Sequence, residues 1–128
     1  MGYGDNAKAA FMTRGLAEIA RLGEALGAHS LTFAGLAGMG DLVATCSSSL
    51  SRNHYVGMQI AMGKTLREIQ ASMDNIAEGI DTTSAAVAMA GNAGIEMPIT
   101  QATHRVLFED VALDQAIAEL LGRPPRPE

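Results

Sequence analysis

Apolar residues recur three and four positions apart along most of the chain, which is the spacing of one face of an α-helix. The clearest stripe passes through Met12, Leu16, Ile19, Gly23 and Leu26. It predicts a helix of about 20 residues, roughly 30 Å long. No segment alternates convincingly between apolar and polar residues, as a half-buried strand would. The pattern therefore predicts an all-α domain of about six to eight helices.

Polar residues ahead of the apolar segments indicate where these helices begin. Asp5 or Asn6 is suited to cap the first helix, Ser30 or Thr32 the second, and Ser51 a later one. The expected helices cover about residues 5–26, 30–36, 42–45, 52–62, 65–72, 82–92, 100–108 and 113–121. Residues 123–128 contain three prolines and are expected to form a frayed tail.

Glycine and proline mark the other helix boundaries. Gly27, Gly63 and Gly94 each follow an expected helix, where a residue free to adopt positive φ is favoured. Thr65 and Glu68 have the spacing of a capping box. Pro98 stands where a helix can begin, because its missing N–H is not needed in a first turn.

Charge and aromatic content exclude some classes of function. The 128 residues carry nine basic and 14 acidic side chains, a formal net charge of −5, and no Trp. A basic stripe or a base-stacking platform for nucleic acid is therefore not expected. Arg14, Glu18 and Arg21 lie near one another on another face of the first helix than the apolar stripe, with the spacing of ion pairs.

The glycine-rich segments do not match nucleotide-binding motifs. Gly35, Gly38 and Gly40 indicate a sharp turn or close packing, but Val43 stands where a dinucleotide fingerprint requires glycine. The segment 57–65 has five residues between its glycines, whereas a P-loop needs four and a preceding strand. A complete nucleotide-binding βαβ unit is therefore absent from this sequence.

Cysteine and histidine give little sign of metal or redox chemistry. The one cysteine, Cys46, is expected to be a small buried hydrophobe rather than a nucleophile, in a reducing cytoplasmic compartment. His29, His54 and His104 are scattered, so no metal site is expected, and His54 is expected to face solvent. No apolar run is long enough to span a membrane, and no signal peptide is recognisable.

The strongest candidate for binding chemistry is the run Ser51-Arg52-Asn53, ten residues beyond Asp41. A guanidinium between short hydrogen-bonding side chains suits a phosphate dianion. The nearby carboxylate would repel phosphate and is better suited to orienting a proton-transferring group. Spacing alone also permits a local interpretation, in which Ser51 is a helix N-cap and Arg52 a solvated charge.

Four segments, in order along the chain, resemble the C-terminal domain of bacterial NAD(P)-dependent sn-glycerol-3-phosphate dehydrogenase. They are Gly4-Asp5-Asn6-Ala7-Lys8-Ala9-Ala10 with Thr13-Arg14-Gly15-Leu16, then residues 33–46, then Leu50-Ser51-Arg52-Asn53, then Gly94-Ile95-Glu96-Met97-Pro98-Ile99-Thr100. Glu78-Gly79 is a fifth, weaker match. Together they span nearly the whole chain.

The resemblance implies a fold and an activity. Residues 1–128 are expected to form one helical domain, similar in fold to the C-terminal domain of 6-phosphogluconate dehydrogenase. This domain would bind the substrate and form the homodimer contact. An N-terminal Rossmann domain, not contained in this chain, would bind NAD or NADP. Hydride would pass between that cofactor and dihydroxyacetone phosphate or sn-glycerol 3-phosphate. The pathway implied is the supply of glycerol phosphate for membrane lipids, in the cytoplasm.

The resemblance also implies roles for individual residues toward the substrate. Asp41 matches an active-site aspartate that orients the catalytic lysine and the substrate hydroxyls. Ser51, Arg52 and Asn53 match residues that bind the substrate phosphate. Thr45 is expected to line the same site.

Further matches concern the cofactor and the missing base. Arg52 would also approach the cofactor phosphates, while Ile76 and Glu78 match cofactor-contacting positions. Asn6 and Lys8 match a motif interpreted as structural, since the family's catalytic lysine lies upstream of it. This chain alone is therefore expected to be inactive. The alternatives are a catalytically silent helical module that dimerises or binds a partner, and a related two-domain hydroxyacid dehydrogenase.

Overall fold

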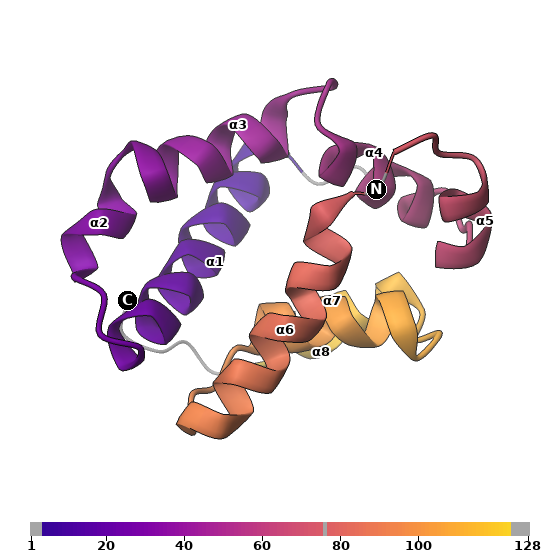
Figure 1. Cartoon of the computed structure of the whole chain (residues 1–128). Coiled ribbons are helices and arrows are strands. Elements are labelled where there is room, and N and C mark those ends of the chain that lie inside the picture. Colours follow the sequence, from indigo (N-terminus) through magenta and orange to yellow (C-terminus); the bar gives the residue numbers. More distant parts are fainter. Residues whose placement is uncertain (1–3, 76, 124–128) are drawn as a thin grey trace.

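The computed structural model describes residues 4–75 and 77–123, which form helices and no strand, as predicted. In the described part of the chain the elements are α1 (Asp5–Ala25), α2 (Ser30–Ala34), the π-helix η1 (Leu36–Gly40), α3 (Asp41–Ser47), α4 (Arg52–Ala61), α5 (Leu66–Ala71), α6 (Glu78–Ala93), α7 (Pro98–Phe108) and α8 (Leu113–Leu121). Helix α1 lies between two groups (Figure 1): α2, η1 and α3 run along one side of it, and α6, α7 and α8 lie on the other.

Most of the predicted helix ends are confirmed. Gly27 and Gly63 follow α1 and α4 with φ of 91° and 85°. The backbone around each glycine makes the paired hydrogen bonds of a Schellman motif. The capping box of Thr65 and Glu68 is complete, and Gly94 ends α6 with φ of 67°. These signals are local, so sequence spacing is enough to locate them.

Three predicted helix starts were wrong. Gly4, not Asp5 or Asn6, is the N-cap of α1, and it contributes no side chain. His29 rather than Ser30 or Thr32 caps α2, where its Nδ1 accepts a hydrogen bond from the N–H of Leu31 at 3.3 Å. Helix α6 begins at Glu78, four residues before the expected start. The predicted tail lies outside the described residues from 124 onward.

Two small clusters of buried apolar side chains hold the helices together. One contains Val56, Ile69, Ala77 and Ile80, and joins α4, α5 and α6. The other contains Leu22, Ala90 and Met97, and joins α1 to α6 and to the segment before α7. Burial of this apolar area is the main favourable contribution to the stability of the domain.

Glu18, which the sequence pattern groups with Arg14 and Arg21 on one face of α1, is buried. Only 3% of the surface of Glu18 is exposed, and its carboxylate reaches from α1 to the first turn of α7. There it accepts hydrogen bonds from the N–H of Ile99 at 2.7 Å and from the N–H and hydroxyl of Thr100, both at 3.0 Å. The partners are 81 and 82 residues away. The carboxylate is therefore the N-terminal cap of α7 and fixes it against α1.

Phe33 connects the α2–η1–α3 segment to α1. A methyl group at Gly23 of α1 would lie 2.1 Å from the Phe33 ring, so the ring rests directly on that glycine. Gly38 of η1 is packed equally closely, since a Cβ there would lie 2.1 Å from the carbonyl oxygen of Phe33. The predicted close packing of this glycine-rich segment is confirmed, and it takes the form of a π-turn directly before Asp41.

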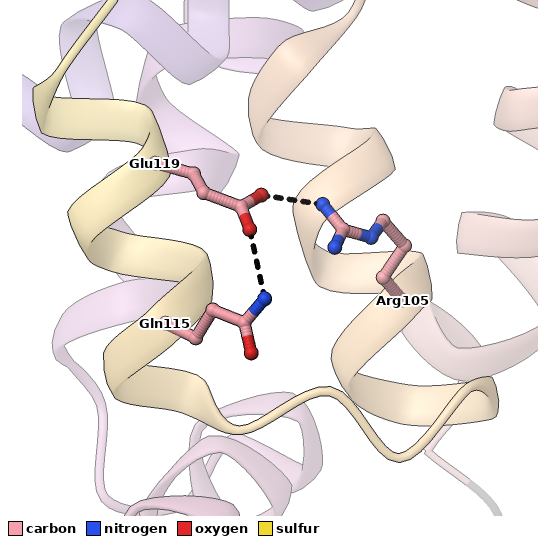
Figure 2. Close-up of polar contacts among 3 residues, drawn as sticks. All are labelled: Arg105, Gln115 and Glu119. Atoms are coloured by element: carbon pink, nitrogen blue, oxygen red, sulfur yellow. Dashed lines mark hydrogen bonds and ion pairs between the residues drawn. The ribbon is translucent and has the colours of Figure 1, made fainter.

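Helices α7 and α8 are joined on their outer surface by an exposed polar cluster (Figure 2). Arg105 of α7 donates to Glu119 of α8 at 2.6 Å, and Gln115 donates to the other oxygen of Glu119 at 3.0 Å. The hydrogen bond from Arg105, followed by the one from Gln115, lowers the pKa of Glu119 below its ordinary value. The same pair raises the pKa of Arg105.

Among residues 4–75 and 77–123, no helix combines the length and the apolar character needed to cross a lipid bilayer.

Candidate functional site

The ends of three helices surround a polar cavity of about 370 Å³, which we call the polar hollow. Helix α3 contributes to it near its C-terminus, and α4 and α6 contribute their N-termini. Its lining residues are Ala44, Thr45, Ser48, Leu50, Ser51, Arg52, Asn53 and Glu78. Five of these were predicted from the sequence as site residues: Thr45, Ser51, Arg52, Asn53 and Glu78.

Ser51 and Arg52 open helix α4 at the edge of the hollow. The Ser51 hydroxyl oxygen accepts a hydrogen bond from the N–H of His54 at 3.2 Å, so Ser51 is the N-cap. Arg52 is the exposed first residue of the helix. The prediction that Ser51 is a helix N-cap and Arg52 a solvated charge is thus confirmed. Both roles are compatible with binding, because the Ser51 hydroxyl keeps its hydrogen for donation and the Arg52 guanidinium lies at the cavity wall.

His54 fixes the loop that forms one side of the hollow. Its Nδ1 lies 2.9 Å from the carbonyl oxygen of Cys46 near the end of α3. Because a carbonyl only accepts, Nδ1 carries the hydrogen in this contact. The expectation of a solvent-facing His54 was wrong, since the residue is half-buried. Eight residues separate the two groups, and no local sequence rule connects them.

Asn53 reaches from α4 to the N-terminus of α6. Its Oδ1 accepts a hydrogen bond from the N–H of Gly79 at 3.1 Å. Gly79 is the second residue of α6, whose own N-cap, Ala77, has no side-chain acceptor. The asparagine therefore caps α6 from another helix and holds two walls of the hollow together.

The charges around the hollow favour an anion at the start of α4 and hydroxyl groups near the start of α6. The N-terminus of α4 carries partial positive charge, has no acidic residue in its first turn and adds the full charge of Arg52, whereas Glu78 and Asp81 offset the N-terminus of α6. Glu78 supplies a carboxylate, which repels phosphate but accepts hydrogen bonds from hydroxyls. A ligand with a phosphate at one end and hydroxyls at the other matches this distribution.

One predicted site residue of the described ranges does not line the hollow. Asp41 is exposed at the start of α3, one helical turn before Thr45, so the two residues share a face of that helix. Ile76 lies outside the described residues. Sequence reasoning missed Ser48, a polar lining residue of the connecting loop, whose hydroxyl accepts a hydrogen bond from the N–H of Leu50 at 3.2 Å.

Cys46 and the potential metal ligands of the described residues show no sign of thiolate or metal chemistry. Burial raises the pKa of the Cys46 thiol, against a smaller opposing effect of Lys8. The thiol is therefore neutral near pH 7 and weakly nucleophilic. Within the described ranges, no group of three His, Cys, Asp or Glu side chains is arranged to hold a metal ion.

A larger cavity, of about 800 Å³, lies between α1, α4, α6, α7 and α8, and we call it the apolar groove. Aliphatic side chains such as Ile80, Leu107 and Ile117 form much of its lining. Asn53 lines both cavities. We place the anion chemistry in the smaller one, because the N-terminus of α4 and Arg52 lie there.

Comparison with known proteins gives consistent matches over the chain. The family model described as "NAD-dependent glycerol-3-phosphate dehydrogenase C-terminus" matches residues 1–118. The chain is 56% identical over 128 residues to glycerol-3-phosphate dehydrogenase (NAD(P)+) 2 of Salinibacter ruber. It is 52% identical over 128 residues to the glycerol-3-phosphate dehydrogenase (NAD(P)+) of Staphylococcus epidermidis strain RP62A.

The fold also matches a solved structure. The 2.1 Å crystal structure of glycerol-3-phosphate dehydrogenase from Coxiella burnetii aligns with a TM-score of 0.89 and 43% identity, covering 94% of this chain and 37% of that one. The chain spans 37% and 39% of the two curated relatives. The similarity therefore covers somewhat more than a third of these longer proteins.

Proposed function

The chain belongs to the family of NAD-dependent glycerol-3-phosphate dehydrogenase C-terminal domains, and on that premise we propose that it is the substrate-binding part of such an enzyme. In the complete protein it would act in the reversible reduction of dihydroxyacetone phosphate to sn-glycerol 3-phosphate. The observation that supports this most strongly is the polar hollow, where Arg52 and the N-terminus of α4 form an anion site beside the carboxylate of Glu78.

We assign the substrate phosphate to the positive side of the hollow. Arg52 donates from its guanidinium fork, and the Ser51 hydroxyl and the Asn53 amide add donors. Thr45 of α3 also lines the hollow, where a hydroxyl of the substrate can meet it. Asp41, one turn earlier on the same face of α3, orients the reacting end of the substrate and the proton-donating lysine of the upstream segment.

The residues present fit a dinucleotide only at its edge, because the fold described here contains no βαβ unit. Arg52 is placed to meet a cofactor phosphate, and Glu78 a cofactor hydroxyl. When bound, NAD(P)H supplies the hydride. The proposal includes NAD or NADP as the cofactor, a contribution of Ile76 to its binding, and assembly into a homodimer. Its single cysteine suits a reducing, cytoplasmic compartment.

A restored enzyme tests the proposal. The N-terminal part of the Salinibacter ruber relative is joined to this chain, and oxidation of NADH and NADPH is followed with dihydroxyacetone phosphate. We expect turnover from the chimera and none from the 128 residues alone, because catalysis requires substrate, cofactor and proton donor together. Binding of sn-glycerol 3-phosphate to the isolated chain, measured by NMR titration, gives a second readout that does not depend on the domain junction.

The Arg52→Ala variant tests whether Arg52 binds the substrate phosphate. We expect the affinity for sn-glycerol 3-phosphate to fall by about 1.5–3 kcal/mol, the value of one hydrogen bond to a charged group. Arg67→Ala, which removes an exposed arginine from α5, is the matched control and should bind like the parent. Equal binding by both variants would favour a silent helical module, and tight binding of a hydroxyacid without phosphate would favour a related dehydrogenase.

A further inference from the structure

We propose that Gly79 is a positioning residue for substrate binding, which acts by fixing the orientation of the Asn53 amide at the polar hollow. This inference rests on the proposed function, because it needs an anionic ligand in the hollow. Two independent features of Gly79 support it: the hydrogen bond that its N–H donates, and the space left by its missing side chain.

The hydrogen bond determines which end of the Asn53 amide stays free. An N–H can only donate, so the atom that faces Gly79 at 3.1 Å must be the oxygen Oδ1. The amino group Nδ2 then remains for a ligand in the hollow that Asn53 lines. Without this contact the amide could rotate by half a turn and present oxygen, which repels a phosphate, in place of two N–H donors.

The missing side chain allows the contact to form. A Cβ on Gly79 would lie 2.7 Å from Oδ1 and 2.8 Å from Cγ of Asn53, closer than non-bonded atoms approach. The obstructing group is the end of a flexible side chain, so Asn53 would move aside rather than unfold α6. An alanine at this position is otherwise favoured in a helix over glycine. The loss of the Asn53 cap and the gain in helix propensity act in opposite directions on stability, so the main expected effect is on binding.

The Gly79→Ala variant of the restored enzyme tests the inference. We expect KM for dihydroxyacetone phosphate to rise by on the order of tenfold, the factor for one hydrogen bond to a charged group, with little change in kcat or in the midpoint of urea unfolding. Gly91→Ala is the matched control, since it makes the same substitution in α6 where a Cβ meets nothing within 4 Å. Its KM should equal that of the parent.

A double-mutant cycle shows whether Gly79 acts through Asn53. In an Asn53→Ala background the obstructing side chain is gone, so adding Gly79→Ala should leave KM unchanged. Asn53→Asp gives a further distinction: it keeps an acceptor for the Gly79 N–H but presents a negative oxygen to the hollow. Substrate affinity should therefore decrease in the order Asn53, Asn53→Ala, Asn53→Asp, while α6 remains folded.

The outcomes separate this inference from the proposed function. If Arg52→Ala raises KM but Gly79→Ala behaves like Gly91→Ala, the positioning role is overturned and the substrate site stands. If the effects of Gly79→Ala and Asn53→Ala on KM are additive, Gly79 does not act through Asn53 and the inference also fails. If Arg52→Ala has no effect on binding of sn-glycerol 3-phosphate, the site assignment itself is wrong.

Discussion

Helices α6 and α7 both receive their N-terminal caps from a side chain on another helix, but the two caps differ in charge and in burial. The cap of α7 is the buried carboxylate of Glu18, which uses both oxygens in three hydrogen bonds. The cap of α6 is the exposed neutral amide of Asn53, which makes one. A carboxylate neutralises the positive end of a helix, whereas an amide leaves it available.

This difference favours the start of α4, rather than that of α7, as the place of the proposed anion site. At α7 the first backbone N–H groups are occupied and the helix dipole is compensated by a full negative charge. At the hollow the caps are Ser51 and Asn53, both neutral. The first turn of α4 has no acidic residue and begins with Arg52, whereas the first turn of α6 carries Glu78 and Asp81. Under the proposed function, the capping side chains therefore suit the start of α7 to stability and the start of α4 to anion binding.

Glu18→Gln should have the largest effect on stability. The substitution preserves volume but removes the charge and turns one acceptor into a donor that faces backbone N–H groups. We expect the free energy of unfolding to fall by about 2 kcal/mol, measured by urea denaturation. Glu24→Gln, at an exposed position of the same helix, is the control and should change it by less than about 0.5 kcal/mol. An unchanged midpoint for Glu18→Gln would contradict the capping role.

Ser51→Asp should make the N-terminus of α4 resemble that of α7. Aspartate is as good an N-cap as serine, so the stability should be equal or slightly higher. Affinity for sn-glycerol 3-phosphate should fall by at least about tenfold, since bringing like charges together in a binding site costs on the order of several kcal/mol. Ser51→Asn caps without charge and should bind more tightly than Ser51→Asp. Equal binding by the two variants would show that capping charge does not govern the hollow.

The exposed pair at the other end of α7 should have the smallest effect. The pKa of Glu119 is lowered in the folded state, so its contribution to stability is complete above the ordinary value of 4.5 and is lost as pH falls through the lowered one. Urea unfolding of the parent and of Glu119→Gln, compared from pH 7 to pH 3, should give curves that converge at acidic pH. A constant gap would mean that the pair does not titrate as described.

Local signals in the sequence were enough for most of the helix boundaries. The capping box at Thr65, the glycines after α1, α4 and α6, and Pro98 at the start of α7 each act within a few residues. The start of α6 was missed for a clear reason: Ala77 has no capping side chain, and the cap comes from Asn53, 26 residues from Gly79. No periodicity encodes such a contact.

The candidate site, too, was predicted where local residue patterns were sufficient and missed where contacts between helices decide. The residue types around Arg52 pointed to an anion, and the fold brings five of the predicted residues to one cavity. Burial of Glu18 could not be predicted, because its helical spacing to Arg14 and Arg21 also fits a surface ion pair. The contact of His54 with the Cys46 carbonyl depends on how α3 and α4 pack, which spacing does not determine.

The distance in sequence between Glu18 and its partners has a consequence for synthesis. The ribosome releases α1 about 80 residues before Ile99 and Thr100 exist. During that interval the carboxylate has no backbone partner, and burying it alone would be costly, so it stays hydrated. A nascent α1 therefore resists collapse onto the wrong surface, and its final packing waits until α7 has emerged.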